Sequence, residues 1–228
     1  MKKVVLCALA LMLGTVGFAQ FNDSDVWQIG ILNTSDVDQT GLLNDADLLQ
    51  VGILNDSDVD QVGAFNSSAT LQVGLANESD VTQFGIGNAS AVAQIGAGND
   101  SDVDQFGVGN LSLVGQLGLL NESDVLQIGF FNASAVAQIG AFNDSNTVQV
   151  GAFNGSGVLQ FGIGNDSDVI QLGLGNGSLV GQFGILNDSY VGQFGAFNGS
   201  TVGQFGLGHT STVIQIGLGN GSSVTQSN

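Results

Sequence analysis

The eleven residues from Gln28 to Asp38, Gln-Ile-Gly-Ile-Leu-Asn-Thr-Ser-Asp-Val-Asp, form a unit that recurs through almost the whole chain. Glutamine returns at every eleventh position from Gln28 to Gln226, nineteen times in all. Glycine follows each of the first eighteen glutamines by two positions, and asparagine follows by five, with His209 as the one replacement. Serine at seven and valine at nine complete the unit Q-x-G-x-x-N-x-S-x-V-x with few exceptions. Such short, regular periodicity is the signature of a repeat architecture.

Within one unit the fixed residues alternate with variable ones at a period of two, which is the pattern of a β-strand. A strand over residues 33–41 would carry its fixed residues on one face, namely Asn33, Ser35, Val37, Gln39 and Gly41. Residues 42–43 are then expected to form a corner. An eleven-residue period also fits a right-handed coiled coil, but every unit would then place a glycine inside a helix at a cost of about 1 kcal/mol. The composition therefore favours strands.

Repetition of strand and corner predicts an all-β fold, a β-solenoid in which each coil stacks on the next at about 4.8 Å. A second period of twenty-two is superposed between residues 55 and 187, because the residue after the repeat asparagine is acidic in every other unit and small or apolar in the units between. Two eleven-residue strand-turn units should therefore make one coil. About nine coils would form a flat cross-β solenoid roughly 45 Å long. One sheet should show an acidic outer face and the other an uncharged one.

The fixed residues are expected to face inward and to line up in ladders. Stacked amides hydrogen-bond along their own ladder, which satisfies polar groups that are costly to bury alone. Glycine permits the backbone conformation of the corner, and asparagine can hydrogen-bond the turn backbone. The predicted self-assembly ladders include Gln28, Gln39, Gln50, Gln61, Gln72, Gln83, Gln204, Gln215, Gln226, Asn33, Asn44, Asn55, Asn198 and Asn220. The predicted corner glycines include Gly30, Gly41, Gly52, Gly206 and Gly217.

Residues 1–19 have the pattern of a secretory signal peptide. Lys2 and Lys3 precede the apolar run 4–16, and small residues near Ala19 predict cleavage there. Removal of this segment would leave residues 20–228 as a single repeat domain.

Charge excludes several classes of partner. Acidic residues outnumber basic ones by twenty to two, and both basic residues lie in the predicted signal peptide. Their loss would take the formal net charge from −18 to −20, which repels nucleic acid and anionic membrane surfaces. The only cysteine, Cys7, also lies there, so we expect no disulfide, thiol nucleophile or thiolate metal site in the mature chain. We also expect no membrane insertion of the mature chain.

The sequence offers no cluster for catalysis or for a cofactor, so we expect no enzyme activity. His209, the sole histidine, occupies the asparagine position of its unit, which predicts a ladder residue rather than a general base. Paired carboxylates on the acidic face are weak candidates for calcium, a hard cation that takes several oxygen ligands, and a solvated face is the simpler interpretation. The calcium candidates are Asp56, Asp58, Asp100, Asp102, Asp166 and Asp168.

Large apolar side chains follow many of the glutamines, although the alternation turns them outward. Such stripes are typical of lateral contacts between fibres or with surfaces. Stacking on the equivalent side chains of neighbouring coils explains them equally well. The outward phenylalanines are Phe84, Phe106, Phe161, Phe183, Phe194 and Phe205, and the corners add Phe65, Phe131, Phe142, Phe153 and Phe197.

The unit resembles the curlin repeat of bacterial curli, whose motif is similar to Q-x-G-x-x-N-x-[AS]-x-x-x-Q. Residues 83–94 fit it throughout, and the resemblance covers essentially all of residues 22–226. It implies a structural subunit that leaves the cell through the periplasm and a dedicated outer-membrane secretion apparatus. At the cell surface it would polymerise on a nucleator into extracellular amyloid fibres of the biofilm matrix, used in adhesion and aggregation. The chain has more units than a typical five-repeat curlin.

Two functions remain open from the residues alone. Solenoids that stay monomeric usually need caps, because their terminal coils expose unpaired backbone groups. No cap is visible on either side of the repeats, so we expect copies to stack end to end as a homopolymer. The alternative is a monomeric ligand-binding or surface-binding solenoid similar to ice-binding proteins. Such a binder would want a regular outward threonine array, and threonine here is scattered.

Overall fold

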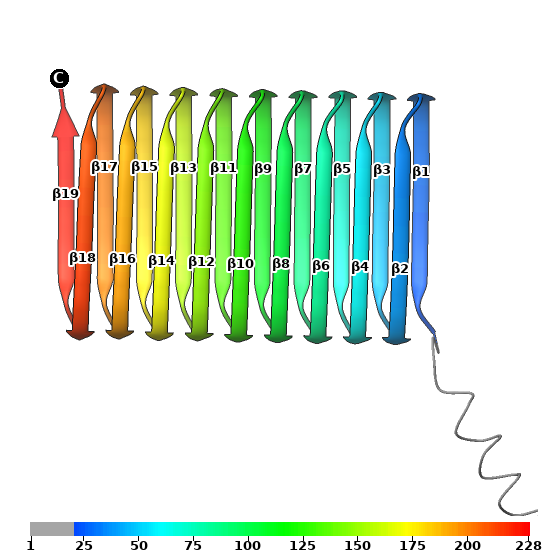
Figure 1. Ribbon diagram of the computed structural model, residues 1–228, viewed down its shortest axis with the longest axis horizontal. Helices are drawn as coiled ribbons and strands as arrows, with labels where there is room; N and C mark the ends of the chain where they lie inside the picture. Colours follow the sequence, from blue (N-terminus) through cyan, green and yellow to red (C-terminus); the bar gives the residue numbers. More distant parts are fainter. Residues whose placement is uncertain (1–20) are drawn as a thin grey trace, which may run out of the picture.

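The computed structural model describes residues 21–228, which fold into β-strands without a helix. The predicted signal peptide, with Cys7, lies outside these described residues. Figure 1 shows the strands side by side in a nearly flat array, with β1 at one end and β19 at the other. The strands are β1 Asp23–Ile31, β2 Thr34–Leu42, β3 Asp45–Ile53, β4 Asp56–Ala64, β5 Ser67–Leu75, β6 Glu78–Ile86, β7 Ala89–Ala97, β8 Asp100–Val108, β9 Leu111–Leu119, β10 Glu122–Phe130, β11 Ala133–Ala141, β12 Asp144–Ala152, β13 Gly155–Ile163, β14 Asp166–Leu174, β15 Gly177–Ile185, β16 Asp188–Ala196, β17 Gly199–Leu207, β18 Thr210–Leu218 and β19 Gly221–Ser227.

Successive strands alternate between two parallel sheets. The ten odd-numbered strands form one sheet and the nine even-numbered strands form the other, each in chain order. Pairing is in register at a spacing of twenty-two residues, so that Gln127 of β10 lies opposite Gln149 of β12. Each pair of strands makes one coil, and the chain builds about nine coils. The prediction of an all-β solenoid with two strands per coil is confirmed.

The bend lies one residue further along the chain than expected. β2 ends at Leu42, so the bend comprises residues 43–44 instead of 42–43, and each repeat asparagine lies in a bend rather than at the start of a strand. The residue after each repeat glycine still pairs in its sheet, as Leu42 does with Ala64. The chain turns at the next residue, which has a left-handed backbone, with φ 54° at Leu43.

The interior is a narrow core of stacked, mostly polar residues. Along β8 the side chains alternate strictly, with Ser101, Val103 and Gln105 buried and Asp100 and Asp102 exposed. On most strands one valine contributes to an apolar column through the coils, and Thr70 and Thr147 take its place on β5 and β12. The largest fully buried side chains are glutamines, which makes their hydrogen bonds decisive for the fold.

The two outer faces differ in charge, as the twenty-two-residue period predicts. From β4 to β16 the even-numbered strands each begin with Asp or Glu, whereas β5, β7, β9, β11, β13, β15 and β17 carry no charged residue. Among the residues that the structure describes, no helix is long and apolar enough to cross a membrane.

Candidate functional site

Two ladders of glutamine carboxamides run along the interior, one on each sheet. The side-chain nitrogen of Gln50 donates to Oε1 of Gln72 at 2.8 Å and to the backbone oxygen of Thr34, on the opposite sheet, at 2.7 Å. The same pair of bonds recurs from coil to coil, and Gln50 is fully buried. Each glutamine therefore joins its own sheet to the next coil and ties the two sheets together.

The glutamine ladders stop at the outermost coils. Gln215 and Gln226 donate to the backbone oxygens of Gly199 and Thr210, at 2.9 Å and 3.0 Å, and within residues 21–228 neither donates to a further glutamine. At the other end, Gln28 and Gln39 donate along the ladder, and no described glutamine donates to them. Both ends of each ladder thus keep hydrogen-bonding capacity for another coil.

The asparagines of the bends form ladders of the opposite polarity. The backbone and side-chain nitrogens of Asn77 both donate to Oδ1 of Asn55 in the preceding coil at 3.1 Å. His209 takes one position in these ladders: its backbone N–H donates to Asn187 Oδ1 at 3.1 Å, and its Nε2 lies 3.1 Å from the backbone oxygen of Phe205. The ring thus makes the contact that Asn220 makes with Ile216, so His209 acts as a ladder residue.

The repeat glycines lie at the next-to-last position of the strands, beside the bends. Gly30, Gly41, Gly52, Gly206 and Gly217 have φ between 120° and 139°, in the region that favours glycine. A Cβ at Gly30 would overlap the carbonyl oxygen of Gly52 in the next coil, and the same overlap recurs between successive repeat glycines as far as Gly195, but not at Gly206 or Gly217. These glycines therefore allow the close approach of one coil to the next as well as the backbone conformation.

Serine hydroxyls line the rest of the interior. Within residues 21–228, the buried hydroxyl of Ser123 has no hydrogen-bond partner, and the same holds for the other buried repeat serines. Side-chain hydrogen bonding between coils is therefore concentrated in the Gln and Asn ladders.

Carboxylates form ladders on the outer face of the even-numbered sheet. Partial burial, followed by the charges of neighbouring carboxylates, raises the pKa of Asp100, Asp102 and Asp144 to about 6. The calcium candidates all lie on this face, with Asp56 and Asp58 on β4, Asp100 and Asp102 on β8, and Asp166 and Asp168 on β14. Within residues 21–228, no group of three or more His, Cys, Asp or Glu side chains is arranged to hold a metal ion.

We expect the solenoid to become more stable as the pH falls from about 7 to about 4. A carboxylate whose pKa is raised by folding binds protons that the unfolded chain releases, so this stabilisation is complete below the ordinary pKa of 3.8 and is lost as the pH rises through about 6. Thermal unfolding at several pH values measures this slope. The triple variant Asp100→Asn, Asp102→Asn, Asp144→Asn should show a smaller slope. Equal slopes for the two proteins would refute this assignment.

The outward phenylalanines are partly exposed and also stack on one another. The ring centroids of Phe161 and Phe183 are 6.4 Å apart, and those of Phe183 and Phe205 are 5.2 Å apart. Phe84 remains 55% exposed. Stacking between coils therefore accounts for part of these stripes, and an apolar surface remains.

Sequence reasoning missed the left-handed residue of each bend. Leu32, Phe65 and Phe142 have φ of 55–58° there, and other units have glycine at the same position, such as Gly87 with φ 66°. A left-handed backbone costs a non-glycine residue about 1–2 kcal/mol. The signal was present in the sequence, as a second glycine that recurs in some units four positions after glutamine.

Comparison with known families supports the resemblance seen in the repeats. The family described as the curlin associated repeat matches residues 55–85 and 74–107. No curated protein matches the chain significantly. The matched segment spans β4 to β7 and most of β8, in the interior of the solenoid.

Proposed function

We propose that this chain, whose residues 55–85 and 74–107 match the curlin associated repeat, is a secreted structural subunit that self-assembles end to end into extracellular, curli-like amyloid fibres of the biofilm matrix. The signal peptide at residues 1–19 directs export and is removed, and the mature chain stays out of the membrane. Its partners are further copies of itself, a nucleator and a dedicated outer-membrane secretion apparatus. Its role in adhesion and aggregation is structural rather than enzymatic.

The observation that carries this proposal is the continuity of the ladders up to the outermost coils. Gln215 and Gln226 keep side-chain N–H groups free for a following coil, and Gln28 and Gln39 can accept from a preceding one. The outermost strands of both sheets also have only one partner each among the described strands. Because the described residues form nineteen strands, a second copy continues both sheets when its β1 pairs with β18 and its β2 with β19. The ladders then continue with the same bonds that join coils inside one copy, and successive copies present opposite outer faces to the same side.

The charge distribution favours head-to-tail addition. β1 and β2 carry Asp23, Asp25, Asp36 and Asp38, whereas β18 and β19 carry no acidic residue. Stacking the N-terminal coil of one copy on the C-terminal coil of another therefore places carboxylates beside neutral residues such as Thr212. No new like-charge pair forms at the junction.

Adding acid at the C-terminal coil should block this junction. In the variant Thr212→Asp, Ser223→Asp the new carboxylates would lie beside those of the incoming N-terminal coil, and each like-charge pair at that distance costs about 1 kcal/mol in water. We expect fibre growth, followed by thioflavin fluorescence and light scattering, to slow about tenfold and to recover at about 1 M salt.

The matched control is Thr82→Asp, Asn146→Asp. It adds the same charge on the outer face of β6 and β12, which lie away from both ends of the solenoid. It should grow at a rate closer to that of the wild-type protein. Equal slowing by both variants would mean that net charge, rather than the junction, limits growth, and fast growth of the first variant would contradict stacking through these coils.

A further inference from the structure

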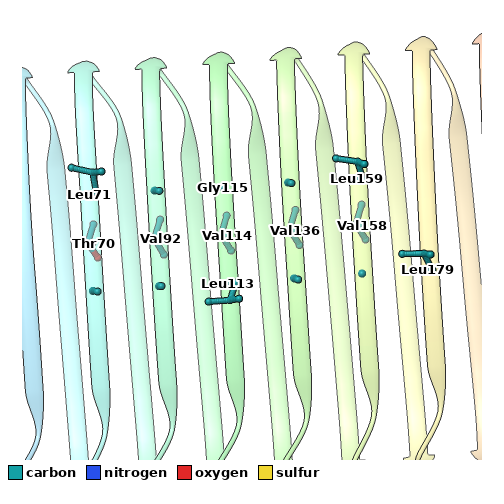
Figure 2. Close-up of a pocket in the computed structure, with 16 residues that line it drawn as sticks. Thr70, Leu71, Val92, Leu113, Val114, Gly115, Val136, Val158, Leu159 and Leu179 are labelled. Carbon is teal, nitrogen blue, oxygen red and sulfur yellow. The ribbon is translucent and has the colours of Figure 1, made fainter.

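The outer face of the odd-numbered sheet carries a long apolar groove. We call the outward residues of β5, β7, β9, β11, β13, β15 and β17 the uncharged face. The groove on this face has a volume of about 660 Å³ and crosses β5 to β15. Its floor is formed by small residues such as Ala91, Gly115 and Ala135, and leucines rise from it. Figure 2 shows Leu71, Gly115 and Leu159 in one row, and Leu113 and Leu179 in a second row.

The sizes of the residues in these two rows are matched. Wherever one of the two central outward residues of a strand is leucine, the other is alanine or glycine. From β5 to β17 the pairs are Ala69 and Leu71, Ala91 and Ala93, Leu113 and Gly115, Ala135 and Ala137, Gly157 and Leu159, Leu179 and Gly181, and Thr201 and Gly203. No strand of this face places two leucines, or a leucine and a β-branched residue, in the central pair.

The flanking outward residues show a similar relation on β13, β15 and β17, whereas β9 has leucine at both flanking positions. From β9 onward the residue at the start of the strand becomes smaller as the residue after glutamine becomes larger. From β5 to β17 these pairs are Ser67 and Val73, Ala89 and Ile95, Leu111 and Leu117, Ala133 and Ile139, Gly155 and Phe161, Gly177 and Phe183, and Gly199 and Phe205. All three phenylalanines of this face are thus paired with glycine on their own strand.

We propose that two copies of this chain pair face to face through their uncharged faces, about a twofold axis parallel to the solenoid axis. About this axis, each strand faces the same strand of the second copy, running in the opposite direction. Each residue of a pair given above therefore lies opposite the other member of that pair in the second copy. Leu113 of one copy then packs over Gly115 of its partner, and Phe161 packs over the partner's Gly155. The pairing concerns the sides of the solenoid and does not depend on end-to-end growth.

Charge and area both favour a second copy as the occupant. The opposite face carries carboxylate ladders from β4 to β16, so two copies repel each other through it. On the odd-numbered sheet the carboxylates are confined to β1 and β3, outside the uncharged face. Seven strands 4.8 Å apart and six residue steps along each strand give about 600 Å² of flat area per copy, and about 1,200 Å² for the pair. That total is at the lower end of stable, specific interfaces.

A twofold axis perpendicular to the solenoid axis fits less well. With β11 at its centre, that axis also places Leu113 opposite a glycine, Gly157. It places Phe161 opposite Leu117 and Phe183 opposite Ile95, however. Of the three glycines at the strand starts, only Gly155 then meets a large residue, Leu111. Of these two axes, only the parallel one places all three phenylalanines opposite glycine.

A knob-to-hole exchange tests this arrangement. Gly115→Leu places a leucine opposite Leu113 of the other copy, while a Cβ at Gly115 meets no atom of its own copy closer than 4.0 Å, the backbone oxygen of Val136. We expect the soluble wild-type protein to sediment as a dimer before fibres form, and Gly115→Leu to sediment as a monomer. The double variant Leu113→Gly, Gly115→Leu restores a leucine opposite a glycine and should restore the dimer. Thr82→Leu adds similar bulk on the acidic face and should leave it unchanged.

Other results would overturn the proposal. A soluble wild-type protein that sediments as a monomer would show that the uncharged faces do not pair, while end-to-end growth would stand if that protein goes on to form fibres. A dimeric Gly115→Leu protein, or a double variant that stays monomeric, would exclude the parallel twofold axis. A wild-type dimer that Gly115→Leu dissociates but that never forms fibres would support the pairing and overturn the proposed function.

Discussion

Replacement of Gly118 by alanine is expected to disrupt the solenoid at that coil. Gly118 has φ 139°, which side-chain-bearing residues rarely adopt, and a Cβ there would overlap the carbonyl oxygen of Gly140 in the next coil. The strained backbone alone costs on the order of 1–3 kcal/mol, and the overlap forces the two coils apart and breaks their ladders. We expect a loss of at least about 3 kcal/mol in the free energy of unfolding, measured by denaturant titration, together with slower fibre growth.

Gly155→Ala is the matched control for this prediction. Gly155 has no left-handed backbone, and a Cβ there would meet no atom within 4 Å. The same substitution should therefore change the stability by less than about 0.5 kcal/mol, as surface substitutions usually do. Equal losses of stability at the two positions would show that alanine acts through general strand propensity. The close approach of the coils at Gly118 would then make no additional contribution to the free energy of unfolding.

The second large effect is expected from Gln127→Leu, which keeps the volume of the side chain and removes its hydrogen bonds. Gln127 accepts from Gln105 at 2.8 Å and donates to Gln149 at 2.8 Å and to the backbone oxygen of Leu111 at 2.9 Å. Each buried group left without a partner costs about 1–3 kcal/mol. We expect a total loss of about 2–5 kcal/mol in the free energy of unfolding, measured in the same titration.

Gln127→Glu separates hydrogen bonding from packing in this ladder. At neutral pH a buried carboxylate without a counter-ion is costly, whereas the protonated acid both donates and accepts. We expect Gln127→Glu to be destabilised at pH 7 and to recover much of the loss in acid, while Gln127→Leu recovers no more than the wild-type protein gains. A leucine variant as stable as the wild-type protein at pH 7 would mean that the ladder does not stabilise the coils.

Much of the fold follows from the repeat itself. The two-residue alternation places Ser101, Val103 and Gln105 inside, and the twenty-two-residue period assigns alternate strands to two sheets with different outer faces. These patterns are visible in one sequence because every coil repeats the same order of inward and outward residues. The position of the bend was predicted one residue too early because periodicity marks which face a residue lies on, whereas the strand ends are set by local backbone conformation at residues such as Leu43.

Other features depend on distances between coils, which periodicity does not contain. The repeat glycines were expected to serve the corner, and the structure adds the contact of Gly30 with the carbonyl of Gly52 in the next coil. The raised pKa of Asp144 likewise depends on its partial burial and on Asp166, twenty-two residues further along. The size matching between Leu113 and Gly115 is present in the sequence, but it acquires meaning only when both residues are placed on one exposed face.

The most direct test of the account is fibre diffraction, with electron microscopy, from the purified protein after incubation at micromolar concentration. End-to-end stacking predicts unbranched fibres with a 4.8 Å spacing along the fibre axis and a spacing of about 10 Å across it. A β-rich protein that stays monomeric by light scattering for days would contradict the account and would make the surface-binding solenoid the better hypothesis.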